Sequence, residues 1–314
     1  AVMTETNAPV KEVNVSLEGS EMNLITNNTG TYNFEGMLSG SNYVVRPTKN
    51  DDHINGISTL DLVMIQRHIL GIEKLNSPYK LIAADVNKDK KITASDLTEL
   101  RKLILGIVNE FSNNTSWRFI DKAYTFQDVQ YAHAETFPEV YFIENMNSNM
   151  EANFMSVKVG DVNGNVVANV NDHNTESRAS SIMELTAENQ TLTAGQTINV
   201  PVVLAQNADV SGFQFTVNYD TELFSLEAVN GGITGMTDNN FGFTRLANGM
   251  VTVSYNRENS LGLKAGDVVF TLSLKAKDQG KLSEGFWIDS AVTKAEAYTS
   301  DHDVIKVEFN VNNR

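Results

Sequence analysis

The stretch DVNKDKKITASD, residues 85–96, decides how the rest of the sequence is interpreted. Side chains that carry oxygen stand at its first, third, fifth and twelfth positions, and the apolar Ile92 at its eighth position can anchor the loop to a core. Ca²⁺ is a hard cation that takes six to eight oxygen ligands, and a short loop of alternating carboxylate and amide groups can surround it. The spacing therefore predicts a calcium loop.

A helix is expected directly behind this loop. Leu97, Leu100, Leu103 and Ile104 recur at helical spacing, and Gly106 follows as a stop signal. A loop that feeds directly into a helix is one half of an EF-hand-like unit.

The loop and helix occur twice. Residues 61–72 align without gaps on residues 96–107, at an offset of 35 residues. Ser58 precedes Asp61 by three residues, and Thr93 precedes Asp96 in the same way, which is the spacing of a capping box with Asp in place of Glu. We expect each Asp to serve both the metal and the positive end of its helix.

This duplicated unit, with both helices ending in Ile-Leu-Gly, resembles the type I dockerin of cellulosome proteins over about 50–107. The resemblance implies a stronger calcium site in the second repeat. Lys90 stands at the sixth position of that loop, where Gly is usual, and a positive φ there would cost about 1 kcal/mol. The expected ligands are the side chains of Asp85, Asn87, Asp89 and Asp96 and the backbone carbonyl of Lys91.

The first repeat departs further from the dockerin pattern. An ungapped alignment implies a weaker calcium site from Asn50, Asp52 and Asp61, but it puts Ile54 at the fifth position, where no side-chain oxygen is available. A one-residue deletion would instead use Asp51, His53 and Asn55. We expect a weak or remodelled site there.

Composition limits the class of protein. The 314 residues carry a formal net charge of −15 with a pI near 4.7, which argues against nucleic acid and anionic membrane surfaces as partners. There is no cysteine and no apolar run long enough to span a membrane, so neither disulfides nor membrane insertion are expected. The start of the sequence at Ala1 and its calcium loops favour the interpretation that the protein is secreted and is extracellular or at the cell surface.

The flanking segments predict a multidomain, mainly β protein. Residues 1–48 alternate apolar and polar residues at 13–17, 32–34 and 43–47, and they resemble the small β-sandwich of carboxypeptidase-regulatory and Cna B-type modules. Residues 108–168, with expected strands at 117–121, 140–143 and 154–159, resemble the β-rich extension that follows dockerin-like repeats in secreted proteins of Bacteroidetes-type bacteria. Residues 169–181 look like a polar linker.

A third stretch of calcium-like spacing lies within the extension. Asp161 and Asn163 begin the run GDVNGN at 160–165, which has no helix behind it. It predicts either a further ion site, alone or shared with a neighbouring loop, or a polar turn built on a favoured Asn-Gly pair. The turn is the favoured interpretation.

Residues 182–314 predict a β-sandwich of about nine strands with Greek-key or jelly-roll connections. Alternating runs occur at 198–204, 213–219, 251–255 and 268–274. Their order, with Thr-Ala-Gly-Gln before the first run and Gly266-Asp267 before the last, resembles a cohesin, the receptor for a dockerin. The chain therefore resembles both halves of one adaptor.

Catalysis is not expected. The five histidines are scattered without a His-x-x-x-His pair, and the sequence has no cysteine nucleophile, Gly-x-Ser-x-Gly elbow or phosphate-binding glycine loop. Trp117 and Trp287 could stack on a glycan, although lone tryptophans in sandwiches usually belong to the core.

Two functions from different classes fit these features. The first is a secreted, non-catalytic, calcium-stabilised assembly protein that binds a cohesin-like or dockerin-like partner, which includes other copies of itself in a filament. The second is a carbohydrate-binding or adhesive segment of a larger surface protein, in which the calcium repeats stiffen a junction. For the first function, the expected partner-binding residues are Thr59, Leu60, Arg67 and His68 in one repeat and Ala94, Ser95, Lys102 and Leu103 in the other.

Overall fold

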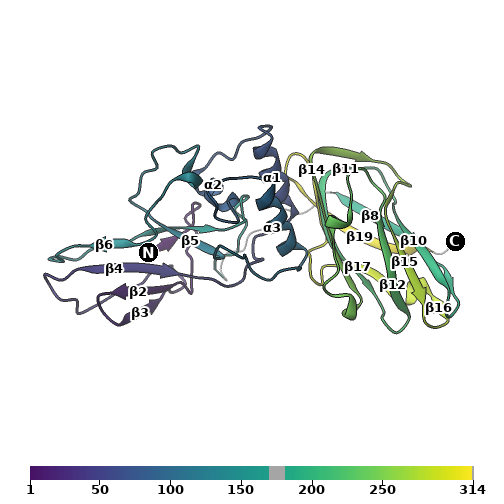
Figure 1. Cartoon of the computed structure of the whole chain (residues 1–314), viewed down its shortest axis with the longest axis horizontal. Helices are drawn as coiled ribbons and strands as arrows, with labels where there is room; N and C mark the ends of the chain where they lie inside the picture. Colours follow the sequence, from purple (N-terminus) through teal and green to yellow (C-terminus); the bar gives the residue numbers. More distant parts are fainter. Residues whose placement is uncertain (170–180, 313–314) are drawn as a thin grey trace. The chain divides into compact units, whose positions relative to one another are not determined.

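The structure of the protein is a computed structural model that describes residues 1–169 and 181–312 (Figure 1). The chain divides into two compact units. The first contains Ala1–Ile57, Arg67–Leu100 and residues 110–169, and the second contains Ser58–Gln66, Arg101–Asn109 and residues 181–312. Except for its two end residues, the expected linker at 169–181 lies outside the described residues. A mainly β chain with three α-helices confirms the expected fold class.

The strands of the first unit form two small sheets. The four-stranded sheet has the order β3-β2-β4-β6 and is antiparallel throughout, and the three-stranded sheet has the order β1-β7-β5. In the first sheet Leu17 pairs with Val45, and Tyr43 pairs with Ile143. The strands are β1 (Val2–Met3), β2 (Asn14–Glu18), β3 (Met22–Ile25), β4 (Tyr43–Thr48), β5 (Trp117–Asp121), β6 (Tyr141–Ile143) and β7 (Phe154–Lys158).

Alternation along the strands builds one core between these sheets. β2 and β4 bury every second side chain, and Val15, Leu17 and Val45 share a single apolar cluster with Trp117 and Phe154 of the other sheet. The N-terminal strands and the 108–168 extension thus share a sheet and a core, although the sequence suggested two modules. The segment 32–34, expected as a strand, lies in a loop.

The two helices of the repeat are α1 (Thr59–Ile69) and α3 (Ala94–Ile104), and each ends two residues before the glycine that the sequence predicts as its stop. Between them lies α2 (Pro78–Ala84), and a 3₁₀ turn η1 (Ala132–Ala134) follows further along. Gly71 and Gly106 follow α1 and α3 at φ +70° and +64°, the left-handed conformation that ends a helix and favours glycine. The short α2 was not predicted. It starts at Ser77, whose hydroxyl accepts from the N–H groups of Tyr79 and Lys80.

The second unit is dominated by a ten-stranded sheet. Its strand order is β12-β15-β10-β8-β19-β18-β11-β14-β13, with β17 paired to β11, and β9 pairs separately with β16. The elements are β8 (Ile182–Glu188), β9 (Thr191–Leu192), β10 (Thr197–Leu204), β11 (Ala208–Tyr219), β12 (Phe224–Gly231), η2 (Asp238–Asn240), β13 (Phe241–Gly242), η3 (Leu246–Asn248), β14 (Met250–Leu263), β15 (Val268–Ala276), β16 (Gly280–Lys281), η4 (Leu282–Glu284), β17 (Phe286–Asp289), β18 (Glu296–Tyr298) and β19 (Val304–Asn312).

This sheet encloses one large apolar core. Phe213, Phe215, Phe224 and Phe270 are completely buried in it. β8 and β19, the first and last strands, pair in parallel, with Met183 opposite Val307. The result is the jelly-roll-like sandwich that the alternating runs predict. Within 1–169 and 181–312, no helix is long and apolar enough to cross a membrane.

Candidate calcium loops and docking face

The loop at 85–96 is organised around two buried carboxylates at its ends. Asp85 ends α2 and Asp96 stands in the first turn of α3, and their side chains are 1% and 0% exposed. Asp85 accepts hydrogen bonds from the N–H groups of Asp89 (3.0 Å) and Lys90 (3.1 Å). Asp96 accepts from the N–H groups of Asn87 (3.1 Å) and Thr93 (2.8 Å). The bond from Thr93 is the capping contact that the sequence predicts.

The backbone of this loop adopts the special conformations that a tight calcium loop needs. Lys88 and Lys90 have φ of +60° and +68°, so Lys90 at the sixth position does adopt the positive φ for which Gly is usual there. Asn114 donates from Nδ2 to the carbonyls of Asp85 (3.3 Å) and Val86 (3.1 Å) and holds the start of the loop from outside.

Burial of the carboxylates of Asp85 and Asp96 is costly when both are ionised, and a bound cation would offset that cost. Burial, with the charges of Asp96 and Asp89, raises the pKa of Asp85 to about 6, against the hydrogen bonds that favour its charged form. Burial likewise raises the pKa of Asp96. The acidic, His and Cys side chains of the described residues do not themselves converge in threes on one point. A calcium loop also uses amide and carbonyl oxygens, such as those of Asn87 and Lys91, and this donor set fits Ca²⁺.

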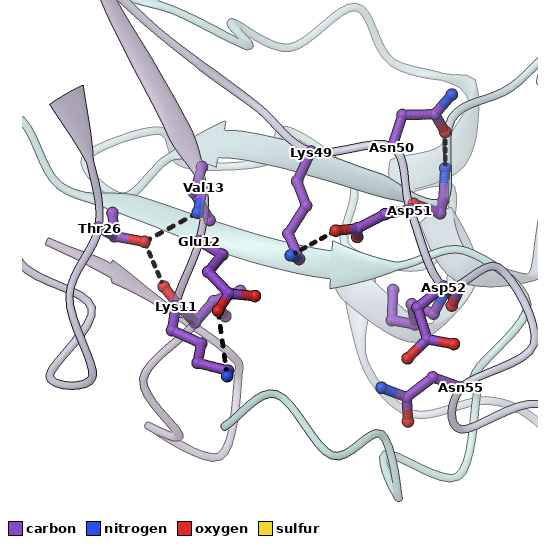
Figure 2. Close-up of polar contacts among 12 residues, drawn as sticks. Lys11, Glu12, Val13, Thr26, Lys49, Asn50, Asp51, Asp52 and Asn55 are labelled. Atoms are coloured by element: carbon purple, nitrogen blue, oxygen red, sulfur yellow. Dashed lines mark hydrogen bonds and ion pairs between the residues drawn. The ribbon is translucent and has the colours of Figure 1, made fainter. Parts of the chain in front are cut away.

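The loop of the first repeat is arranged differently, because Asn50 and Asp51 bond to partners other than a metal (Figure 2), as does Asn55. Asn50 accepts from the N–H of Ser116 through Oδ1 (2.8 Å), and Asp51 pairs with Lys49 (2.9 Å). Asn55 exchanges two hydrogen bonds with the backbone of Val167.

A buried lysine enters this first loop from β7. Lys158 Nζ donates to the backbone carbonyls of Asp52 (2.9 Å) and His53 (3.0 Å). The imidazole of His53 packs edge-on against Phe111 at a centroid distance of 5.6 Å. Asp61, the expected closing ligand, accepts from the N–H of Ser58 (2.9 Å) and caps α1.

The third stretch forms a closed polar turn. Asp161 accepts from the N–H groups of Gly164 (2.7 Å), Asn165 (3.3 Å) and Val166 (2.9 Å), and Asn163 Oδ1 accepts from Asn165 (2.9 Å). The turn lies against the first loop, since a Cβ added at Gly56 would stand 2.9 Å from Asp161 Oδ2.

Within the second unit, residues of α1 contact the sheet through buried polar groups. Thr59, completely buried, donates from its N–H to Gln214 Oε1 (2.7 Å), and its hydroxyl lies 2.7 Å from that of Ser254. Asn256 donates to Gln66 (2.6 Å) and accepts from Arg101.

The last turn of α3 and the residues after it are bonded to threonines of the same unit. The hydroxyls of Thr293, Thr252 and Thr244 donate to the carbonyls of Ile104 (3.0 Å), Leu105 (2.6 Å) and Gly106 (3.0 Å). These carbonyls lack partners within a helix, so side chains from outside satisfy them. We call this contact surface the docking face. Opposite the helices it comprises Gln214, Thr252, Ser254 and Asn256 on the strands β11 and β14, and Thr244 and Thr293 in the connections between strands.

Family profiles match both regions. Residues 50–105 match the dockerin type I domain, and residues 183–312 match the cohesin domain. The chain carries a type I dockerin domain and a cohesin domain. Type I dockerins are calcium-binding domains, and both domains are modules of protein–protein assembly.

Solved structures show a more distant similarity, and no curated protein matches. A type I cohesin–dockerin complex from Clostridium thermocellum is 17% identical, covering 43% of this chain and 97% of that one, with a TM-score of 0.33. A ScaB type I cohesin from Pseudobacteroides cellulosolvens is 16% identical, covering 43% and 93%, with a TM-score of 0.34. A non-cellulosomal cohesin from the archaeon Archaeoglobus fulgidus is 17% identical, covering 42% and 88%, with a TM-score of 0.30.

The expected partner-binding residues of the dockerin domain have different surroundings. Of these, Thr59, Leu60 and Leu103 are buried, whereas Ala94, Ser95 and Lys102 are exposed. Arg67 Nε bonds to Glu73 (3.0 Å), and His68 Nδ1 accepts from the N–H of Leu75 (3.1 Å).

Sequence reasoning missed Gln66, Arg101 and the whole cohesin side of the docking face. A signal was present in the strands. On β11 and β14, uncharged polar residues alternate with the apolar ones where an ordinary solvent face would carry Lys or Glu. Gln214 and Ser254 from this alternation are 3% and 0% exposed.

Proposed function

We propose that the protein is a secreted, non-catalytic assembly protein that joins modules through contacts between dockerin and cohesin domains. The observation that carries the proposal is the set of hydrogen bonds at the docking face, centred on Thr59, Gln214 and Ser254. Interaction domains account for most of the described chain, and domains of this kind typically belong to extracellular or cell-surface proteins. Protein partners of the cohesin or dockerin kind follow from this proposal.

Calcium is the cofactor of this proposal. The side chains of Asp85, Asn87, Asp89 and Asp96 and the backbone carbonyl of Lys91 would hold it, and the bound ion would offset the charge of the buried carboxylates of Asp85 and Asp96. The chain's own amide groups orient these oxygens and fix the start of α3.

The same docking face can act between copies. A dockerin surface of one chain that binds the cohesin surface of the next forms a head-to-tail contact, which does not close and therefore extends into a filament. Sedimentation velocity should show a mass that grows with protein concentration in millimolar calcium and a monomer in EGTA.

Ser254→Arg tests whether the docking face carries this assembly. It puts a charge against Thr59 and should abolish the growth in mass, whereas Asn230→Arg, at an exposed position of β12, should not. A wild-type chain that stays monomeric in calcium at the highest concentration would contradict assembly between copies.

Glycan binding remains a second candidate because Trp287 of β17 is 45% exposed, while Trp117 is buried in the core. An exposed indole can stack on a sugar ring. A glycan array should then give hits that Trp287→Ala removes, and an array without hits counts against this function.

A further inference from the structure

The first dockerin loop lacks a calcium-like arrangement of oxygens. Asn50 bonds to the backbone of Ser116 and Asp51 bonds to Lys49 (Figure 2), and Asn55 bonds to the backbone of Val167. Ile54, in the fifth position, has no side-chain oxygen. The residues of this loop therefore do not fit the ion that the dockerin family implies.

A positive charge is nevertheless present in this loop. The side chain of Lys158 is 4% exposed, and its ammonium donates to the carbonyls of Asp52 and His53 at 2.9 and 3.0 Å. The ring centroid of Trp117 lies 5.7 Å from Nζ, close enough for a cation–π contact. Backbone carbonyls that turn toward one buried cation are the kind of ligand that calcium loops also use.

The surrounding carboxylates balance this charge. Burial lowers the pKa of Lys158 to about 8, while the negative charges of Asp52, Asp161 and Asp51 act in the opposite direction. Lys158 is therefore mostly protonated at neutral pH. Its ammonium is compact and carries three donors, so it can bind several oxygens at once.

The second loop offers a direct contrast. Two of its three lysines contact groups outside the loop, since Lys88 forms an ion pair with Glu139 at 3.8 Å and Lys90 donates to Thr136 at 2.8 Å, and Lys91 is exposed. Within the described residues, the carboxylates of Asp85 and Asp96 accept from backbone N–H groups and, more weakly, from the hydroxyl of Thr93, and from no cationic side chain. The loop of repeat two can thus take a cation from solution, whereas the loop of repeat one already contains the ammonium group of Lys158.

We propose that the Lys158 ammonium takes the place of a calcium ion in the first dockerin loop. Neither that loop nor the adjoining turn at 161–165 then binds calcium, and strand β7 is a permanent part of the dockerin domain. The full chain should bind one calcium ion, at 85–96, and this holds whether or not the chain assembles.

Calorimetric titration of stripped full-length protein tests the number of sites. The wild-type chain should bind one Ca²⁺, and Asp85→Ala should bind none. A calcium ion retained by the Asp85→Ala chain, or two ions bound by the wild type, would overturn the proposal.

Hydrogen exchange tests the role of the lysine itself. Lys158→Met keeps the aliphatic stem and removes the charge, so amides of residues 50–57 should exchange at least about tenfold faster in saturating calcium, with 85–93 unchanged. The matched control is Lys122→Met, at an exposed position, which should leave 50–57 protected. Unchanged protection in Lys158→Met would overturn the proposal. If Lys158→Met fails to fold, the calcium titration of Asp85→Ala still tests the proposal, because it shows whether the first loop binds calcium.

Discussion

At the scale of single residues, the raised pKa of Asp85 links calcium binding to pH. Ca²⁺ binds the ionised carboxylate, and the metal-free loop holds a proton on Asp85 below about pH 6. Protons therefore compete with the metal, and the affinity should fall as pH falls, by about tenfold between pH 7 and pH 5. Calorimetric titration at several pH values measures this, and an affinity independent of pH over that range would show that Asp85 is not a ligand.

The residues also show how far the sequence could predict the loops. The twelve-residue spacing placed Asp85 and Asp96 at the two ends of one loop, and it marked Lys90 as the position where a positive φ would matter, because both features depend on neighbours within the loop. The state of the first loop could not be predicted, since it depends on Lys158, about a hundred positions away in the sequence. Only the missing oxygen at Ile54 indicated that this site differs.

At the scale of elements, the end of β7 supports a prediction about packing. Gly160 and Gly164 have similar positive φ, +87° and +77°, so a Cβ strains both backbones equally. A Cβ at Gly160 would also stand 2.7 Å from Leu100 Cδ1 and 2.9 Å from Ile57 Cδ1, whereas Gly164 has open space. In urea unfolding, Gly164→Ala should cost about 1 kcal/mol and Gly160→Ala a further 1–3 kcal/mol.

Equal losses for the two variants would mean that the turn after β7 can shift away from α3 without cost. The loss should appear as a lower urea midpoint with an unchanged slope, because crowding changes stability and not the surface exposed on unfolding.

Elements were predictable where the pattern is local. The spans of β5 and β10 follow the expected ranges within one residue, and α3 contains all the apolar positions expected at helical spacing, because alternation and helical spacing are carried by the strand or helix itself. The helix α2, of seven residues, is too short for a periodic signal. The pairing of β4 with β6 was not predictable either, because a three-residue strand says nothing about a partner a hundred positions earlier.

At the scale of the whole molecule, a chain that carries both complementary surfaces can join them within itself or with another copy, and these two contacts compete. A contact within a chain benefits from a high effective concentration, so it opposes assembly between copies. Thr59→Arg leaves only the cohesin surface functional, and Ser254→Arg leaves only the dockerin surface functional, because each charge blocks one half of the buried Thr59–Ser254 pair.

Each of these variants alone should be monomeric in calcium, since neither has both intact surfaces. Mixed in equal amounts, they should form a dimer and nothing larger, because one contact uses the only intact pair of surfaces. Mass photometry or sedimentation of the mixture measures this, and EGTA should dissolve the dimer by loosening the loop before α3. A mixture of Asn230→Arg with Thr59→Arg keeps an additional intact surface and serves as the matched control. If the first mixture stays monomeric at concentrations where the wild type assembles, the docking face does not join chains.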